Sequence, residues 1–149
     1  MTTIHQWLDQ YAESHQNPLN ILIHWWCVPI IFWSISGFLF LVTLPVVGNL
    51  AIPVLVVLTI YYLRITRLLW LGLLLFATVG VYLNFLLFSR IGIMSAWVYL
   101  TLFVIAWILQ FYGHYKEGKK PSFLKDLHFL IIGPAWLMAK IYKRMKLPI

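Results

Sequence analysis

Three histidines stand at the ends of long apolar segments, where they could meet around one metal ion. His15 and His24 lie on either side of the start of the first apolar segment, and His114 lies at the end of the last long one. Imidazole is the most versatile metal ligand in proteins, and an all-histidine site with open positions suits iron, zinc or copper. These three side chains are therefore the predicted metal-binding and catalytic residues.

The spacing of His15 and His24 requires a break in the chain between them. On one straight helix, residues at this separation would lie on opposite faces and about 13 Å apart along the axis. Asn17 and Pro18 supply the break, because asparagine caps helices well and proline is a good first helical residue. The N-terminal segment can then fold back over the start of the apolar helix and bring the two imidazoles together.

Two amides lie one helical turn before predicted ligands. Asn20 precedes His24 and Gln110 precedes His114. Either side chain could hydrogen-bond the second nitrogen of a ligand or a bound substrate.

Three charged or titratable residues lie near the third histidine or after it. Glu117 could act as a carboxylate ligand or an acid–base group. Lys116 either attracts an anionic substrate head group or only satisfies topology and anionic lipid. His128 is a candidate fourth ligand, a substrate contact or a plain interfacial residue.

The composition that must position these residues is that of a membrane protein. The 149 residues are 62% hydrophobic and 10% charged, whereas a soluble domain is about half apolar and about a quarter charged. Residues 28–44 and 68–88 carry no charge, and about 20 helical residues cross a hydrocarbon core. We therefore expect a single integral-membrane domain over residues 1–149.

The expected fold is an all-α, polytopic membrane helix bundle with about four transmembrane helices. An amphipathic helix should precede them, because Ile4, Trp7, Leu8 and Tyr11 recur on one helical face, which we expect to lie along the membrane surface. A last apolar segment, interrupted by Gly133-Pro134, is too short to span comfortably and is expected to be interfacial or re-entrant. The predicted spans are residues 18–43, 50–63, 68–88 and 94–112, and the last segment is 127–139.

The charge distribution predicts the orientation of the bundle and argues against nucleic-acid binding. With the N-terminus in the cytoplasm, only Arg90 of the 11 lysines and arginines lies outside, as expected from the excess of basic residues in cytoplasmic loops. Both termini and the metal site are then cytoplasmic. The net charge of +7 is thus explained by topology and lipid head groups, so the predicted partner is membrane lipid.

Two sequence blocks resemble one known family. Residues 15–24, HQNPLNILIH, with Pro29 after them, resemble its first block, and QFYGH at 110–114 with a following Glu-Gly and Pro121 resembles its second. Together with the later Gly133-Pro134 they resemble the small membrane 2-hydroxy-fatty-acid dioxygenases of fatty acid α-oxidation. In the family pattern the glutamate stands one residue farther from the histidine, and no histidine corresponds to His128, so the resemblance assigns these two residues no role.

The resemblance implies an iron(II) enzyme that acts on a 2-hydroxy fatty acid such as 2-hydroxypalmitate. With O2 it would yield CO2 and a fatty acid one carbon shorter. Three histidine ligands leave about three open positions on a six-coordinate ion, enough for a chelating 2-hydroxy acid and O2. The eukaryotic member of the family lies in the endoplasmic reticulum, whereas this short chain with minimal loops favours a bacterial inner membrane.

Two other classes of function remain open at this point. A haem- or quinone-binding membrane subunit could use two histidines as axial ligands, and a non-catalytic membrane subunit would need no metal. An absorption spectrum and metal analysis separate these classes. A homo-oligomer is compatible with the sequence.

Overall fold

The computed structural model describes residues 3–124 and 128–149 and is almost entirely helical. Lys125 and Leu127, which enter the predicted charge count and the predicted last segment, lie outside the described residues. A two-stranded antiparallel hairpin and two short 3-10 turns join some of the helices. The elements in chain order are α1 (Ile4–Ala12), α2 (Pro18–Leu41), β1 (Thr43–Leu44), β2 (Gly48–Asn49), α3 (Ala51–Ile65), α4 (Leu69–Ile91), η1 (Gly92–Met94), α5 (Ser95–Glu117), η2 (Ser122–Leu124) and α6 (His128–Arg144).

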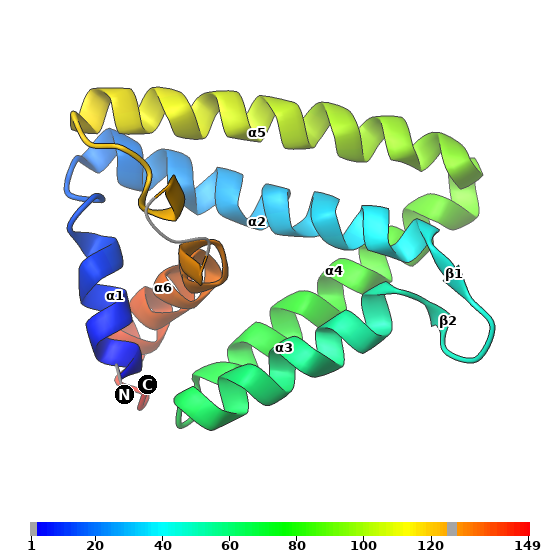
Figure 1. Ribbon diagram of the computed structural model, residues 1–149, viewed down its shortest axis with the longest axis horizontal. Helices are drawn as coiled ribbons and strands as arrows, with labels where there is room; N and C mark the ends of the chain where they lie inside the picture. Colours follow the sequence, from blue (N-terminus) through cyan, green and yellow to red (C-terminus); the bar gives the residue numbers. More distant parts are fainter. Residues whose placement is uncertain (1–2, 125–127) are drawn as a thin grey trace.

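The helices form an open wedge (Figure 1). Helices α2 and α5 lie side by side along the long axis, and α3 with α4 forms a hairpin that diverges from them. Helix α6 lies in the angle and contacts α1, α2 and α4, while α1 crosses the same end of the molecule. This arrangement brings α1 and the C-terminal residues to the side of the molecule on which α2 starts and α5 finishes.

The predicted break between the first two helices is confirmed. Asn17 caps α2, since its side-chain oxygen accepts a hydrogen bond from the Leu19 N–H at 2.9 Å, and Pro18 is the first helical residue. Helix α1 starts at a capping box, in which Thr3 and Gln6 each accept from the backbone N–H of the other. The chain therefore turns sharply between His15 and His24.

Helix α5 extends beyond its predicted end and so carries more of the candidate site. It was expected to stop near residue 112, but it continues to Glu117 and ends at Gly118, which adopts the left-handed conformation with φ 72°. Glycine is favoured at this position because it lacks a Cβ. As a result His114 lies inside the helix, one turn from its end.

The last helix is continuous and longer than predicted, and the first helix packs on it, while the predicted position of both at the membrane surface stays a prediction. Helix α6 runs through Gly133-Pro134 without a break and continues to Arg144. The apolar face of α1 packs on α6, so that Leu8 and Tyr11 are buried within the protein. Gly133 allows this approach, because a Cβ there would lie 3.1 Å from the Tyr11 hydroxyl.

Within the part of the chain that the structure describes, two helical stretches are long and apolar enough to cross a membrane. They are Pro18–Leu41, which is α2, and Leu69–Glu117, which contains α4, η1 and α5. Helix α3 has 15 residues, fewer than the ~20 that a bilayer core requires. The four predicted spans and their orientation therefore remain predictions.

Candidate metal centre

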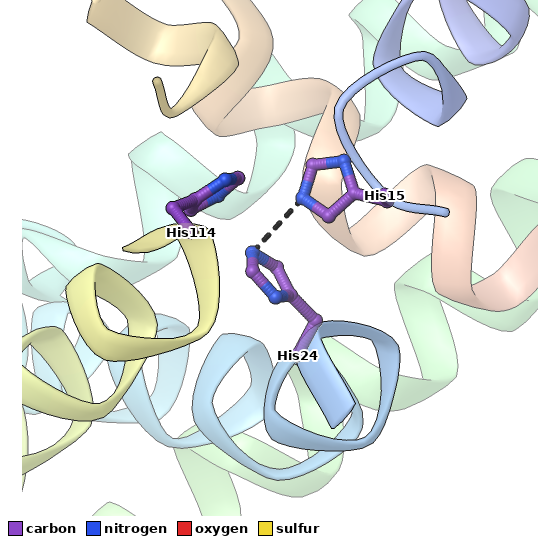
Figure 2. Close-up of side chains that lie close together, drawn as sticks. All are labelled: His15, His24 and His114. Carbon is purple, nitrogen blue, oxygen red and sulfur yellow. Dashed lines mark hydrogen bonds between the residues drawn. The ribbon is translucent and has the colours of Figure 1, made fainter. Parts of the chain in front are cut away.

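His15, His24 and His114 converge at the end of the molecule where α1, α2, α5 and α6 meet (Figures 1 and 2). One nitrogen from each ring lies within 4.8 Å of the corresponding nitrogens of the other two. The three residues are buried, with 3%, 1% and 4% of their surface exposed, respectively. The predicted convergence is confirmed, and the histidines lie close enough to bind one metal ion.

Backbone carbonyls orient two of the rings. The Nδ1 atom of His15 lies 2.6 Å from the Tyr11 carbonyl oxygen, and the Nδ1 atom of His24 lies 2.9 Å from the Asn20 carbonyl oxygen. A carbonyl oxygen can only accept, so each Nδ1 carries the hydrogen and donates it. Each Nε2 then presents a lone pair, as in histidine ligands whose other nitrogen bonds a backbone carbonyl.

The two Nε2 atoms face one another at 3.0 Å (Figure 2). With both protons on Nδ1, two lone pairs meet at hydrogen-bond distance inside the protein, which is repulsive unless a cation lies between them. Two nitrogens bound to one metal at about 2.1 Å and at right angles are about 3.0 Å apart. The spacing of the two nitrogens therefore fits adjacent ligands of one ion.

His114 is the third histidine of the cluster, and one of its ring nitrogens makes no hydrogen bond to a described residue. Among the residues that the structure describes, its Nδ1 is buried without a hydrogen-bond partner. A buried nitrogen without a hydrogen-bond partner lowers the stability of the fold by about 1–3 kcal/mol unless a ligand binds it. Its ring centre lies 4.9 Å from that of His15 and 5.0 Å from that of His24, so a bound ion would be within reach of the ring.

Burial favours the neutral form of His15, which is the form that binds metals. Its pKa is lowered to about 3, first because the ring is removed from water and second because it lies beside His24. The ring also stacks on Tyr11, with ring centres 4.1 Å apart and an angle of 9° between the planes. The imidazole is thus neutral and held in place at neutral pH.

Glu117 does not join the histidines but ties together the segments that carry them. Its two carboxylate oxygens accept from the backbone N–H groups of Gln16 at 2.9 Å and Asn17 at 2.7 Å. The Asn20 side-chain amide donates to the same carboxylate at 3.2 Å. These bonds fix the end of α5 to the turn after His15, so we assign Glu117 a positioning role.

Asn20 and Gly113 bring α2 and α5 close together beside the centre. The Asn20 side chain is fully buried and also donates to the Ser14 carbonyl oxygen at 3.1 Å. A Cβ at Gly113 would lie only 2.5 Å from the Asn20 side-chain oxygen. The absence of a side chain at Gly113 is therefore required for this helix contact, which the sequence did not indicate.

Of the other predicted site residues, only Gln110 lines the same cavity as the histidines, whereas Lys116 and His128 do not. Gln110 lines a small cavity of about 30 Å³ together with the three histidines. Lys116 lies over the rings of Tyr112 and Tyr115, at 5.5 and 5.9 Å. The structure does not bring His128 to the other histidines, because its Nε2 contacts the Tyr61 hydroxyl and its ring packs edge-on against Trp7.

Several aromatic side chains at the centre were not foreseen. Tyr11, Trp107 and Phe129 line the cavity beside the histidines, and Trp136 lies 5.2 Å from His15, ring centre to ring centre. Their aromatic character was visible in the sequence, but it is shared with residues that anchor a membrane protein at the interface. The small volume also disfavours the haem alternative, since it is about the volume of one water molecule.

A buried cluster of three histidines at the junction of apolar helices defines a small helical protein with a candidate metal centre. The comparison with protein families agrees with the resemblance of the two sequence blocks. Residues 1–145 match the Mpo1-like family, described as 2-hydroxy-palmitic acid dioxygenase Mpo1-like, and the chain belongs to this family. The comparisons with curated proteins and with solved structures give no match.

Proposed function

We propose that this protein is an iron(II)-dependent dioxygenase that shortens 2-hydroxy fatty acids by one carbon. The observation that carries the proposal is the pair of Nε2 atoms of His15 and His24 at 3.0 Å, with a third buried histidine beside them. The family description supplies the class of substrate. An all-nitrogen site with open positions suits iron chemistry with O2.

The reaction balances without an external reductant. The bond between C1 and C2 of the 2-hydroxy acid breaks, C1 leaves as CO2, and C2 becomes the carboxyl carbon of the shorter acid. The substrate gives up four electrons, which reduce O2, and the remaining oxygen and hydrogen atoms form one water. Iron(II) held by the three histidines would supply the binding positions and the redox chemistry for this exchange.

The protein's own groups hold the ligands and keep water out. The backbone carbonyls of Tyr11 and Asn20 hold two imidazoles in the tautomer that offers Nε2. Burial by Trp107 and Phe129 keeps the site dry, which strengthens the attraction between charges inside it. Gln110 lies in the wall and offers an amide donor to the carboxylate or hydroxyl of the substrate.

We also propose that the protein crosses the membrane with both termini and the metal centre on the cytoplasmic side, in a bacterial inner membrane. The predicted orientation rests on the basic residues of the loops. A fatty-acid substrate dissolved in the bilayer would then reach the centre along the apolar helices. Labelling of single engineered cysteines at Arg90 and Lys143 in a Cys27→Ala background tests the orientation: only the former should react from outside intact cells.

The activity is tested with purified protein freed of metal and then loaded with iron(II). With 2-hydroxypalmitate under air, we expect equal amounts of CO2 and pentadecanoate, with one O2 consumed for each. Loading with zinc is the control, because zinc occupies histidine sites without redox chemistry. Absence of CO2 from the iron-loaded protein, or equal release from the zinc-loaded protein, would contradict the proposal.

A further inference from the structure

A large apolar cavity lies beside the metal centre, between α2 and the α3–α4 hairpin. Its volume is about 340 Å³, within the range of about 300–1,000 Å³ in which small-molecule sites fall. Phe32 of α2, Leu58 of α3, and Leu73 and Phe76 of α4 are among the side chains in its wall. Its wall is formed mainly by α2, α3 and α4, whose arrangement is drawn in Figure 1.

The hydroxyl groups in the wall of this cavity are already used by the protein. The Ser36 hydroxyl donates to the Trp33 carbonyl oxygen at 2.8 Å and accepts from the Asn84 amide at 2.8 Å. The Thr59 hydroxyl donates to the Leu55 carbonyl oxygen, also at 2.8 Å. These hydroxyl hydrogens are therefore not offered to a ligand, and the chemistry of the wall suits a hydrocarbon chain.

The cavity and the histidine pocket are neighbouring spaces in the structure. Phe32 lines both spaces. Its neighbour Ile31 lines the histidine pocket, and on α6 Gly133 lines the pocket while the adjacent Pro134 lines the cavity. A molecule with its polar end at the histidines and its tail past Phe32 would thus pass directly from one space into the other.

The cavity also opens toward the lipid-facing side of the molecule. Ile35, Val79 and Leu83 line it and remain 38%, 46% and 46% exposed. By contrast, a second space that His15 borders, of about 280 Å³, has three charged residues in its wall, Asp9, Lys140 and Lys143. An acyl chain would therefore favour the space between α2, α3 and α4, on the far side of Phe32.

We propose that this cavity holds the acyl tail of the 2-hydroxy fatty acid while its head group lies at the histidines. The inference rests on the proposed function for the identity of the ligand. The free space around Phe76 and Gly80 then determines which acyl chain lengths the enzyme turns over efficiently. Phe32 lies at the boundary between the space for the head group and the space for the acyl tail.

A cavity-filling variant with a matched control provides the test. Gly80 lines the cavity, and a Cβ there would meet Trp33 at 3.7 Å and Ser36 at 3.9 Å, which are ordinary contacts. Gly80→Leu should therefore fold and occupy part of the space. Thr78→Leu is the control, since Thr78 is exposed on the same helix and is not part of the cavity wall.

The first readout is turnover of a long and a short 2-hydroxy acid by iron-loaded protein. We expect Gly80→Leu to reduce kcat/KM for 2-hydroxypalmitate by about tenfold, as expected when apolar contacts are lost, and to leave 2-hydroxyoctanoate within about twofold. Thr78→Leu should match the wild type with both acids. Equal losses with both acids in Gly80→Leu, or no loss with either, would overturn the assignment.

The second readout needs neither iron nor activity. Metal-free protein in lipid nanodiscs is irradiated with 2-hydroxypalmitate carrying a diazirine midway along its chain, and labelled peptides are identified by mass spectrometry. We expect labelling of α2 and α4 at the cavity that excess 2-hydroxypalmitate removes, and that Gly80→Leu lowers but Thr78→Leu does not. Labelling that competitor and variant leave unchanged would overturn the cavity assignment, whereas competed labelling without turnover in any iron-loaded protein would refute the proposed function alone.

Discussion

The two sides of α2 are packed in different ways. Toward α5 and α1, buried polar groups such as His24 and Asn20 are held by hydrogen bonds to backbone atoms and by close contact with Gly113. Toward α3 and α4, apolar side chains enclose a cavity of about 340 Å³. Buried polar groups must be paired and so have few allowed positions, whereas apolar walls have no such directional requirement.

From this difference in packing we infer that the two sides of α2 have different roles. The side that carries His24 places its Nε2 3.0 Å from that of His15, and the side that carries Phe32 leaves space for a flexible ligand. Substitutions on the first side should therefore reduce stability, iron binding and activity far more than equivalent substitutions on the second side. The predictions below test this contrast, beginning with the largest expected effect.

Removing one ligand should abolish iron binding and turnover. For His15→Ala, His24→Ala or His114→Ala, we expect bound iron near zero and a loss of activity of more than about 100-fold, since even indirect partners of metal ligands are worth about 10–100-fold. Elemental analysis and CO2 release measure the two effects. His5→Ala, at an exposed histidine on α1, is the control and should retain both. Full iron and activity in any of the three variants would remove that residue from the centre.

The two glycines Gly113 and Gly80 allow the two sides of α2 to be compared directly. Gly113→Ala should lower the free energy of unfolding by about 1–3 kcal/mol, because its Cβ would lie 2.5 Å from the Asn20 oxygen. Gly80→Ala meets its nearest neighbour at 3.7 Å and should be neutral or stabilising by up to about 1 kcal/mol. Thermal unfolding in detergent measures both. If the two variants lose stability equally, the contrast between the sides is wrong.

Neutralising Glu117 should loosen the centre without removing a ligand. Glu117→Gln keeps the shape but loses the charge that strengthens its bonds to the Gln16 and Asn17 N–H groups, so iron affinity should fall about tenfold. A competition titration against a chelator measures the affinity. Glu13→Gln, at an exposed acid after α1, should leave the affinity unchanged; an equal fall in both variants would indicate a general charge effect instead.

The smallest effect is expected from pH, in the metal-free protein. Folding lowers the pKa of His15 from 6.5 to about 3, so the unfolded chain takes up the proton first. The contribution of His15 to stability is complete above pH 6.5 and is lost as the pH falls toward 3. Between about pH 7.5 and about pH 5.5 the loss from His15 should be about 1 kcal/mol. Unfolding curves should show a smaller loss in His15→Gln, and an unchanged loss would refute the role of this imidazole.

The sequence predicted the part of the centre that depends on local geometry. The cap at Asn17 and the proline after it are local signals, and they were sufficient to predict that His15 folds back on His24. The apolar periodicity of α1 was equally clear, but periodicity does not reveal whether lipid or protein covers the apolar face. Its partner, α6, was expected to break at Gly133-Pro134, and the structure shows that tertiary packing maintains the helix there.

The sequence contains no comparable local signal for polar contacts between residues far apart in the chain, or for cavities. The bonds between Glu117 and the Gln16 N–H join residues 101 positions apart and use a backbone donor that every non-proline residue has. Gly113 follows the last predicted span, which was expected to end at residue 112, and only the extension of α5 places it against Asn20. The cavity beside Phe32 arises from the angle between helix pairs, which neither composition nor spacing determines.

X-ray absorption at the iron edge of the wild-type protein, loaded anaerobically with one equivalent of iron(II), tests the central claim most directly. If His15, His24 and His114 hold one ion, the spectrum should require three imidazole nitrogens at about 2.1 Å. The three alanine variants, loaded in the same way, should retain too little iron to give this imidazole shell. A shell of oxygen atoms alone, or one that these substitutions leave unchanged, would contradict the account.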